Sequence, residues 1–150
     1  MTRNDPSAAG YAGDLQASEA WDLLRARSDA QLVDVRTAPE WSFVGLPDLS
    51  SLGREVHRIE WQHYPEMTVN PDFTAAVGQA MAKIGVTPEA PLIFLCRSGA
   101  RSRSAAMAMT QAGCAKAFNL VGGFEGDLDP ERHRGRTNGW KASGLPWRQT

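Results

Sequence analysis

The run LIFLCRSGARSRS at residues 92–104 places a cysteine, a glycine and three arginines close together. Its first four residues are apolar and predict a buried strand, at whose end Cys96 stands. The residues beyond Gly99 predict a helix from about Ser102 to Ala112. A cysteine between a strand end and a helix start, flanked by guanidinium groups, is expected to be a thiolate and therefore a nucleophile.

The same turn is suited to binding an anion. Backbone N–H groups that converge at a helix start form a concave donor site, and Gly99 permits a backbone conformation that a side chain would obstruct. Helical geometry directs Arg101 toward this site and Arg103 away from it. The predicted binding residues are Arg97, Ser98, Gly99, Ala100, Arg101 and Ser102. The alternative is that Cys96 is a buried, inert small hydrophobe, but the surrounding glycine and arginines favour the functional interpretation.

Strands and helices alternate along the chain, which predicts an α/β fold with a mostly parallel sheet. Helical spacing is found near residues 17–24 and over 73–84, whereas short apolar or alternating runs predict strands at 32–35, 56–61, 92–95 and 118–121. Because parallel strands share an orientation, their carboxyl ends lie on one edge of the sheet, where ligands bind. That edge is expected to carry Cys96, the segment from Asp34 to Arg36, and the pair Gly122–Gly123.

Length and composition predict how the rest of the chain is organised. Residues 1–13 are predicted to form a flexible arm and 14–150 a single domain. Residues 37–40 are expected to be a turn and 62–71 an extended loop. The stretch 125–139 holds four acids, three arginines and a histidine, which predicts a charged surface insertion.

Bulk properties exclude several classes of protein. The net charge of −1 argues against a general role on nucleic acid or anionic membranes, and no apolar run is long enough to span a bilayer. The polar start lacks the apolar core of a signal peptide, so the expected location is cytoplasmic. Two cysteines make no disulfide framework. The three histidines, His57, His63 and His133, match no metal-ligand spacing, and no metal site is predicted.

Several motifs together resemble the rhodanese family of sulfurtransferases. They are CRSGARS at 96–102, LVDVR at 32–36 followed by Glu40-Trp41, NLVGGF at 119–124, and the ending WKASGLP at 140–146. The resemblance implies a rhodanese-like domain with a five-stranded parallel sheet and helices on both faces. It also implies that Cys96 accepts a sulfane sulfur from a small sulfur-containing anion such as thiosulfate.

By the same resemblance, the persulfide on Cys96 passes its sulfur to a thiol, cyanide or protein acceptor. Arg97 and Arg101 are the candidates to hold the donor's sulfonate, and no metal or organic cofactor is required. Asp34 and Arg36 either brace the loops at the sheet edge, which is preferred, or help to orient the cysteine loop. Glu40 is expected to be an ordinary surface or helix-start acid.

Two departures from the family pattern concern the loops. Residues 44–51 keep only a trace of a glycine-rich family stretch and receive no role. The insertion at 125–139 follows the last strand on the active edge, so it either borders the pocket and helps to choose the acceptor or is a solvated loop. Trp41, Trp61 and Tyr64 either form an apolar rim beside the pocket or pack in the core, which is preferred. Cys114 lies past the far end of the helix after Cys96, too distant to form a disulfide with it.

Two other functions compete with free sulfur transfer. A binding or sulfur-courier module with little free turnover would keep the same loop. A cysteine phosphatase or arsenate reductase uses five residues between cysteine and arginine, whereas four separate Cys96 from Arg101 here. The shorter loop favours a sulfane sulfur over a tetrahedral phosphate.

Overall fold

The computed structural model describes residues 10–149, and a five-stranded sheet lies at their centre. The strand order is β1-β8-β7-β2-β4, and every neighbouring pair runs parallel. This confirms the predicted α/β fold with a five-stranded parallel sheet. The strands are β1 (Gly13–Leu15), β2 (Gln31–Asp34), β4 (His57–Arg58), β7 (Leu92–Leu95) and β8 (Ala117–Leu120).

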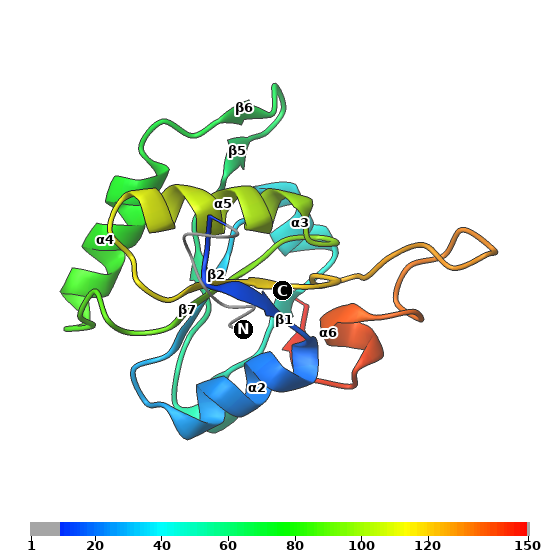
Figure 1. Ribbon diagram of the computed structural model, residues 1–150. Helices are drawn as coiled ribbons and strands as arrows, with labels where there is room; N and C mark the ends of the chain where they lie inside the picture. Colours follow the sequence, from blue (N-terminus) through cyan, green and yellow to red (C-terminus); the bar gives the residue numbers. More distant parts are fainter. Residues whose placement is uncertain (1–9, 150) are drawn as a thin grey trace.

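Helices cover both faces of this sheet (Figure 1). On one face lie α4 (Phe73–Lys83) and α5 (Ala100–Gln111), and on the other lie α2 (Ala17–Ala26) and α6 (Gly139–Ala142). Side chains alternate along β7, so that Phe94 packs under α4 and α5 while Ile93 and Leu95 join the opposite cluster. A strand that is buried on both faces must be apolar throughout, which explains the LIFL run.

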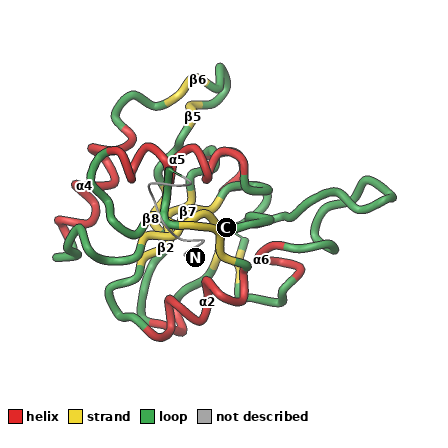
Figure 2. The backbone as a smooth tube through the Cα atoms, in the orientation of Figure 1, coloured by secondary structure: helices red, strands yellow, loops and turns green. Residues whose placement is uncertain are grey.

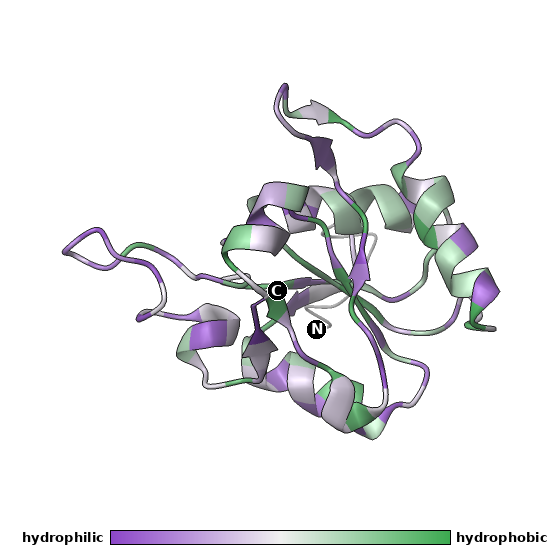
Figure 3. Cartoon of the chain, turned by 180° about the vertical axis from the view of Figure 1, so that it is seen from behind, coloured by the Kyte–Doolittle hydropathy of each residue, from purple (hydrophilic) through white to green (hydrophobic). Residues whose placement is uncertain are grey.

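Shorter elements lie around the carboxyl edge of the sheet. They are α3 (Ala38–Phe43), a 3₁₀ turn (Ser50–Leu52), the antiparallel pair β3 (Leu46–Pro47) and β9 (Trp147–Arg148), and the hairpin β5 (Gln62–His63) and β6 (Thr68–Val69). Two segments project from the body, namely this hairpin and the loop after β8 (Figure 2). The projecting loop is largely hydrophilic (Figure 3). Within the described part of the chain, no helix has the length and apolar character needed to cross a membrane.

Three local predictions were wrong. Residues 37–40 are not a simple turn, because Thr37 and Glu40 form a capping box that starts α3. The strand predicted at 56–61 is shorter, at His57–Arg58, although the N–H groups of Ile59 and Trp61 still donate to the Asp34 and Val35 carbonyls at 3.1 Å. The loop predicted at 62–71 contains the short β5–β6 hairpin.

The predicted arm at 1–13 falls mostly on residues 1–9, which lie outside the described residues. For residues 11–13 the prediction of a flexible arm was wrong. Tyr11 and Ala12 are buried, the Ala12 N–H donates to the Ala117 carbonyl at 2.8 Å, and Gly13 begins β1. Pairing of β1 with β8 holds this segment in place. The prediction missed it because the polar and small residues of the segment show no strand pattern.

Candidate active site

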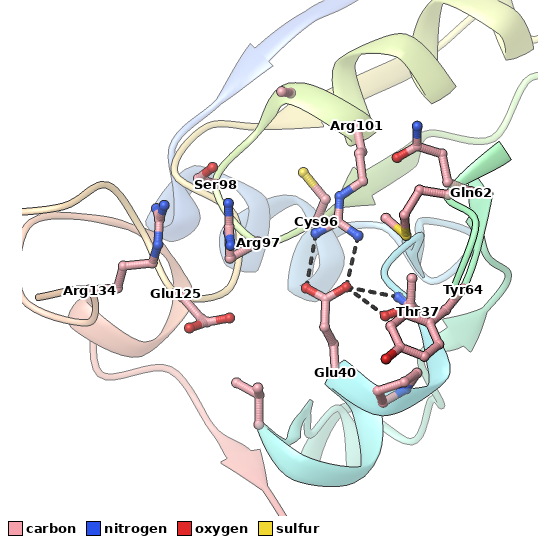
Figure 4. Close-up of a pocket in the computed structure, with 14 residues that line it drawn as sticks. Thr37, Glu40, Gln62, Tyr64, Cys96, Arg97, Ser98, Arg101, Glu125 and Arg134 are labelled. Atoms are coloured by element: carbon pink, nitrogen blue, oxygen red, sulfur yellow. Dashed lines mark hydrogen bonds and ion pairs between the residues drawn. The ribbon is translucent and has the colours of Figure 1, made fainter. Parts of the chain in front are cut away.

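Cys96 lies at the carboxyl end of β7, directly before the turn that begins α5. Only 1% of the residue is exposed, and it forms part of the wall of a pocket of about 670 Å³. Four parts of the chain line this pocket: the start of α3, the β5–β6 hairpin, the turn after β7, and the loop after β8 (Figure 4). A pocket of this size can hold a small molecule.

Two groups from the turn surround the sulfur of Cys96. The backbone N–H of Gly99 donates to Sγ at 3.1 Å, and the Ser102 hydroxyl oxygen lies 3.2 Å from Sγ. Gly99 has a φ of 123°, a conformation that L side chains rarely adopt. The turn therefore places a backbone donor against the sulfur, as the sequence predicted for this motif.

The backbone of the turn is held from the opposite side by residues 123–125, which follow β8. The N–H of Phe124 donates to the Cys96 carbonyl at 2.8 Å, and the N–H of Glu125 donates to the Arg97 carbonyl at 3.0 Å. Gly123 is packed so closely that a Cβ there would lie 2.3 Å from the Cys96 carbonyl oxygen. The two motifs are separated in sequence but are joined by hydrogen bonds and close packing at the edge of the sheet.

Arg101 points into the pocket and is paired with Glu40 of α3. Its two terminal nitrogens donate to the two carboxylate oxygens at 2.8 and 2.9 Å (Figure 4). Burial acts to raise the pKa of Glu40, but hydrogen bonds from Arg101 and Thr37 outweigh it and lower the pKa to about 2. Glu40 is thus the helix-start acid that was expected, and it also neutralises an arginine 61 residues away.

Arg97 and Ser98 also line the pocket, with Ala100 beside them. The loop after β8 contributes Glu125 and Arg134, so the predicted insertion does border the pocket. Arg134 is anchored by a 2.7 Å hydrogen bond from Nη1 to the Gly126 carbonyl. Sequence reasoning did not single out Arg134, because nothing local separates it from the other arginines of the loop.

Asp34 and Arg36 are fully buried and form an ion pair with an Nη2–Oδ2 distance of 2.7 Å. The same Nη2 donates to the Gly45 carbonyl at 2.7 Å, and the guanidinium carbon lies 4.3 Å above the Phe124 ring. Neither residue lines the pocket. The pair therefore joins three loops at the sheet edge, which is the bracing role preferred from the sequence.

Core packing was the preferred expectation for Tyr64, but the residue is 59% exposed and lines the pocket from the hairpin together with Gln62 and Met67, as in the alternative of a rim beside the pocket. The expectation was wrong because the hairpin carries it away from the sheet. Cys114 is buried beyond the far end of α5, where burial raises the pKa of its thiol.

The loop after β8 brings Asp129, Glu131 and His133 together, with ligand atoms within 4.8 Å of one another. These side chains already form hydrogen bonds and ion pairs within the loop. Asp129 Oδ1 accepts the backbone N–H groups of Glu131 and His133, and Arg136 lies within 3.6 Å of both carboxylates. The cluster closes the loop on itself, and none of its three residues lines the pocket.

Comparisons with known proteins agree with this architecture. The rhodanese-like domain family matches residues 16–128. The crystal structure of Rv0390 from M. tuberculosis is 50% identical, with a TM-score of 0.80 over 93% of this chain and 99% of that one.

Two curated sequences are also similar. An uncharacterized protein, RC0915 of Rickettsia conorii, is 34% identical over 87% of this chain and 93% of its own length. The thiosulfate sulfurtransferase GlpE of Actinobacillus succinogenes is 26% identical over 89% of this chain and 87% of its own. With the matched family spanning most of the described fold and the cysteine turn in place, the chain belongs to the rhodanese-like family.

Proposed function

We propose that the protein is a sulfurtransferase that carries a sulfane sulfur on Cys96. The observation that supports this most directly is the placement of the Cys96 sulfur in a pocket wall, 3.1 Å from a backbone N–H at the start of a helix. Some members of the family are sulfurtransferases, and a similar curated protein is named a thiosulfate sulfurtransferase.

The proposed reaction has two displacements at sulfur. In the first, the Cys96 thiolate attacks the outer sulfur of thiosulfate, a new S–S bond forms, and the S–S bond of thiosulfate breaks to release sulfite. In the second, a thiolate or cyanide attacks the outer sulfur of the persulfide, and Cys96 leaves as the thiolate. The sulfane sulfur moves from donor to acceptor, the Cys96 thiolate is regenerated, and no external oxidant or reductant is required.

For the donor's sulfonate we propose Arg97 and Arg134 in place of the expected Arg97 and Arg101. Arg101 is already neutralised by Glu40, so the turn's Arg97 and the loop's Arg134 are better placed to hold the anion. Arg101 then serves to stabilise the pocket rim and the sulfur at the turn.

The test is a sulfur-transfer assay from thiosulfate to cyanide together with intact-mass measurement. Wild-type protein should gain one sulfur atom on incubation with thiosulfate, and Cys96→Ala should gain none and lose activity. Cys114→Ala is the matched control, because that thiol is buried at the other end of α5, and it should behave as wild type. A wild-type protein that forms no persulfide with thiosulfate or mercaptopyruvate would refute the proposal.

The same experiment separates free turnover from a sulfur-courier role. A courier would take up one sulfur but transfer it slowly to cyanide or small thiols. Rapid hydrolysis of an aryl phosphate without sulfur uptake would instead indicate the phosphatase reaction.

A further inference from the structure

The candidate pocket has two sides of different chemistry (Figure 4). On one side lie the charged side chains of the cysteine turn and of the loop after β8, to which the donor's sulfonate is assigned above. On the other side the β5–β6 hairpin contributes Gln62, Tyr64 and Met67, all of them uncharged. The ion pair of Arg101 with Glu40 lies between the two sides and is neutral as a whole. An anion and an uncharged group would therefore bind to opposite sides of the same pocket.

The hairpin side exposes large apolar side chains beside this pocket. Tyr64 is 59% exposed and Met67 is 37% exposed, although both line the pocket. Pro39 at the start of α3 adds a further apolar group to the lining. Exposed apolar side chains that gather beside a pocket are typical of a binding surface, and the flat ring of a tyrosine is well suited to contact another aromatic ring.

The position of Cys96 determines how an acceptor must approach. Only 1% of the residue is exposed, so an acceptor reaches its sulfur through the pocket that the residue lines. In the proposed second displacement, the acceptor thiolate attacks the outer sulfur of the persulfide, a new S–S bond forms, and Cys96 leaves as the thiolate. The rest of the acceptor then extends along one of the two sides. An uncharged apolar group gains contacts on the hairpin side, whereas cyanide is too small to use it.

We propose that the hairpin selects the sulfur acceptor, and that Tyr64 makes the protein favour thiols that carry an aromatic group. This inference rests on the proposed role of Cys96 as the sulfur carrier. Tyr64 contributes a large apolar contact area and loses little side-chain entropy when it is ordered, because it has only two side-chain torsions. Since the donor's sulfonate binds on the opposite side, loading with sulfur does not depend on Tyr64.

The test uses two thiols that differ in one group. Both 2-phenylethanethiol and 2-mercaptoethanol place two methylenes behind the thiol, and they end in a phenyl ring and a hydroxyl. Protein is loaded with thiosulfate and freed of the donor, and loss of the sulfur atom to each thiol is followed by intact mass. Wild-type protein should favour 2-phenylethanethiol. Tyr64→Ala should raise the half-saturating concentration of this thiol about threefold or more, and leave 2-mercaptoethanol and the loading step unchanged.

Two further variants separate the ring contact from the shape of the hairpin. Tyr64→Phe keeps the ring and should behave as wild type. Val69→Ala removes an apolar group that is 52% exposed on the same hairpin but does not line the pocket, and it should change neither thiol. The proposal is overturned if Tyr64→Ala keeps the preference for the phenyl group, or if it slows transfer to both thiols equally.

A second measurement probes the same surface without sulfur transfer. Iodoacetanilide is iodoacetamide with an added phenyl ring, and in both reagents the Cys96 thiolate displaces iodide from carbon. In a Cys114→Ala background, the ratio of the two alkylation rates should favour iodoacetanilide and fall about threefold or more in Tyr64→Ala. If no persulfide forms with thiosulfate, the proposed function fails and this ratio alone decides the inference: an unchanged ratio overturns it, and the expected fall supports it. If the persulfide forms, the transfer experiment decides.

Discussion

The position of the Cys96 sulfur depends on a residue that is not in its own loop. Gly123 has a φ of 59°, and a Cβ there would lie 2.3 Å from the Cys96 carbonyl oxygen and 2.6 Å from the Arg97 carbonyl carbon. Both contacts are to backbone, so a side chain could be accommodated only if the cysteine turn moved. Gly123 is thus a packing requirement of the nucleophile's loop.

Gly123→Ala should therefore displace the turn and slow persulfide formation by about tenfold to a hundredfold, because reactive groups tolerate little misplacement. Stopped incubations with thiosulfate, followed by intact mass, measure this rate. Gly53→Ala is the control: its φ of 69° imposes similar backbone strain, but its Cβ would meet nothing within 4 Å. A Gly123→Ala protein with the wild-type rate would contradict the packing argument.

At the scale of the elements, the pocket is completed by two segments that project beyond the sheet. The β5–β6 hairpin supplies Tyr64 and the loop after β8 supplies Arg134. The loop after β8 has two parts with different roles. Around Asp129, its hydrogen bonds and ion pairs are to other residues of the same loop. Its base, meaning here Glu125 and Arg134, lines the pocket. Substrate choice is therefore expected to depend on the base of the loop.

Arg134→Gln should raise KM for thiosulfate about threefold or more, because a charge-assisted contact to the sulfonate is lost. The rate with saturating thiosulfate should change little. Steady-state kinetics with cyanide as acceptor measure both quantities. Arg132→Gln removes the same charge from an exposed residue outside the pocket and should leave KM unchanged. Equal effects of the two substitutions would indicate only a general loss of positive charge.

At the scale of the whole molecule, the fold continues past residue 128, where the family match ends. Trp140 of α6 is completely buried, meets Trp21 of α2 edge to face at 5.9 Å, and donates from Nε1 to the Pro146 carbonyl at 2.7 Å. The closing strand β9 then pairs with β3. These contacts support the prediction that residues after the insertion belong to the same domain.

Trp140→Ala should accordingly lower the free energy of unfolding by about 3–5 kcal/mol, the usual range for removing a buried aromatic side chain. Urea unfolding followed by circular dichroism measures the change. Trp147→Ala, at a tryptophan that is 41% exposed, should cost clearly less. If the two variants were equally stable, the last segment would be only loosely attached to the core.

Much of the site could be predicted because its parts lie within short motifs. Strand β7, the turn at Gly99 and the start of α5 are consecutive, so Cys96, Arg97 and Arg101 were identified from local pattern alone. The pairing of Arg101 with Glu40 was missed because it joins α3 to α5 across 61 residues. The Thr37–Glu40 capping box was a readable signal for α3, but it does not reveal what else the carboxylate binds.

The amino-acid sequence by itself determined the family, the order of strands and helices, and the cysteine turn, because hydrophobic periodicity, glycines and short motifs act over a few residues. Only the tertiary structure decided which distant groups meet at that turn. It placed Gly123 against the Cys96 backbone, Glu40 on Arg101, and Asn119 and Asp14 behind Ser102. Parallel strands bring their ends together from distant parts of the chain, and no local pattern records those neighbours.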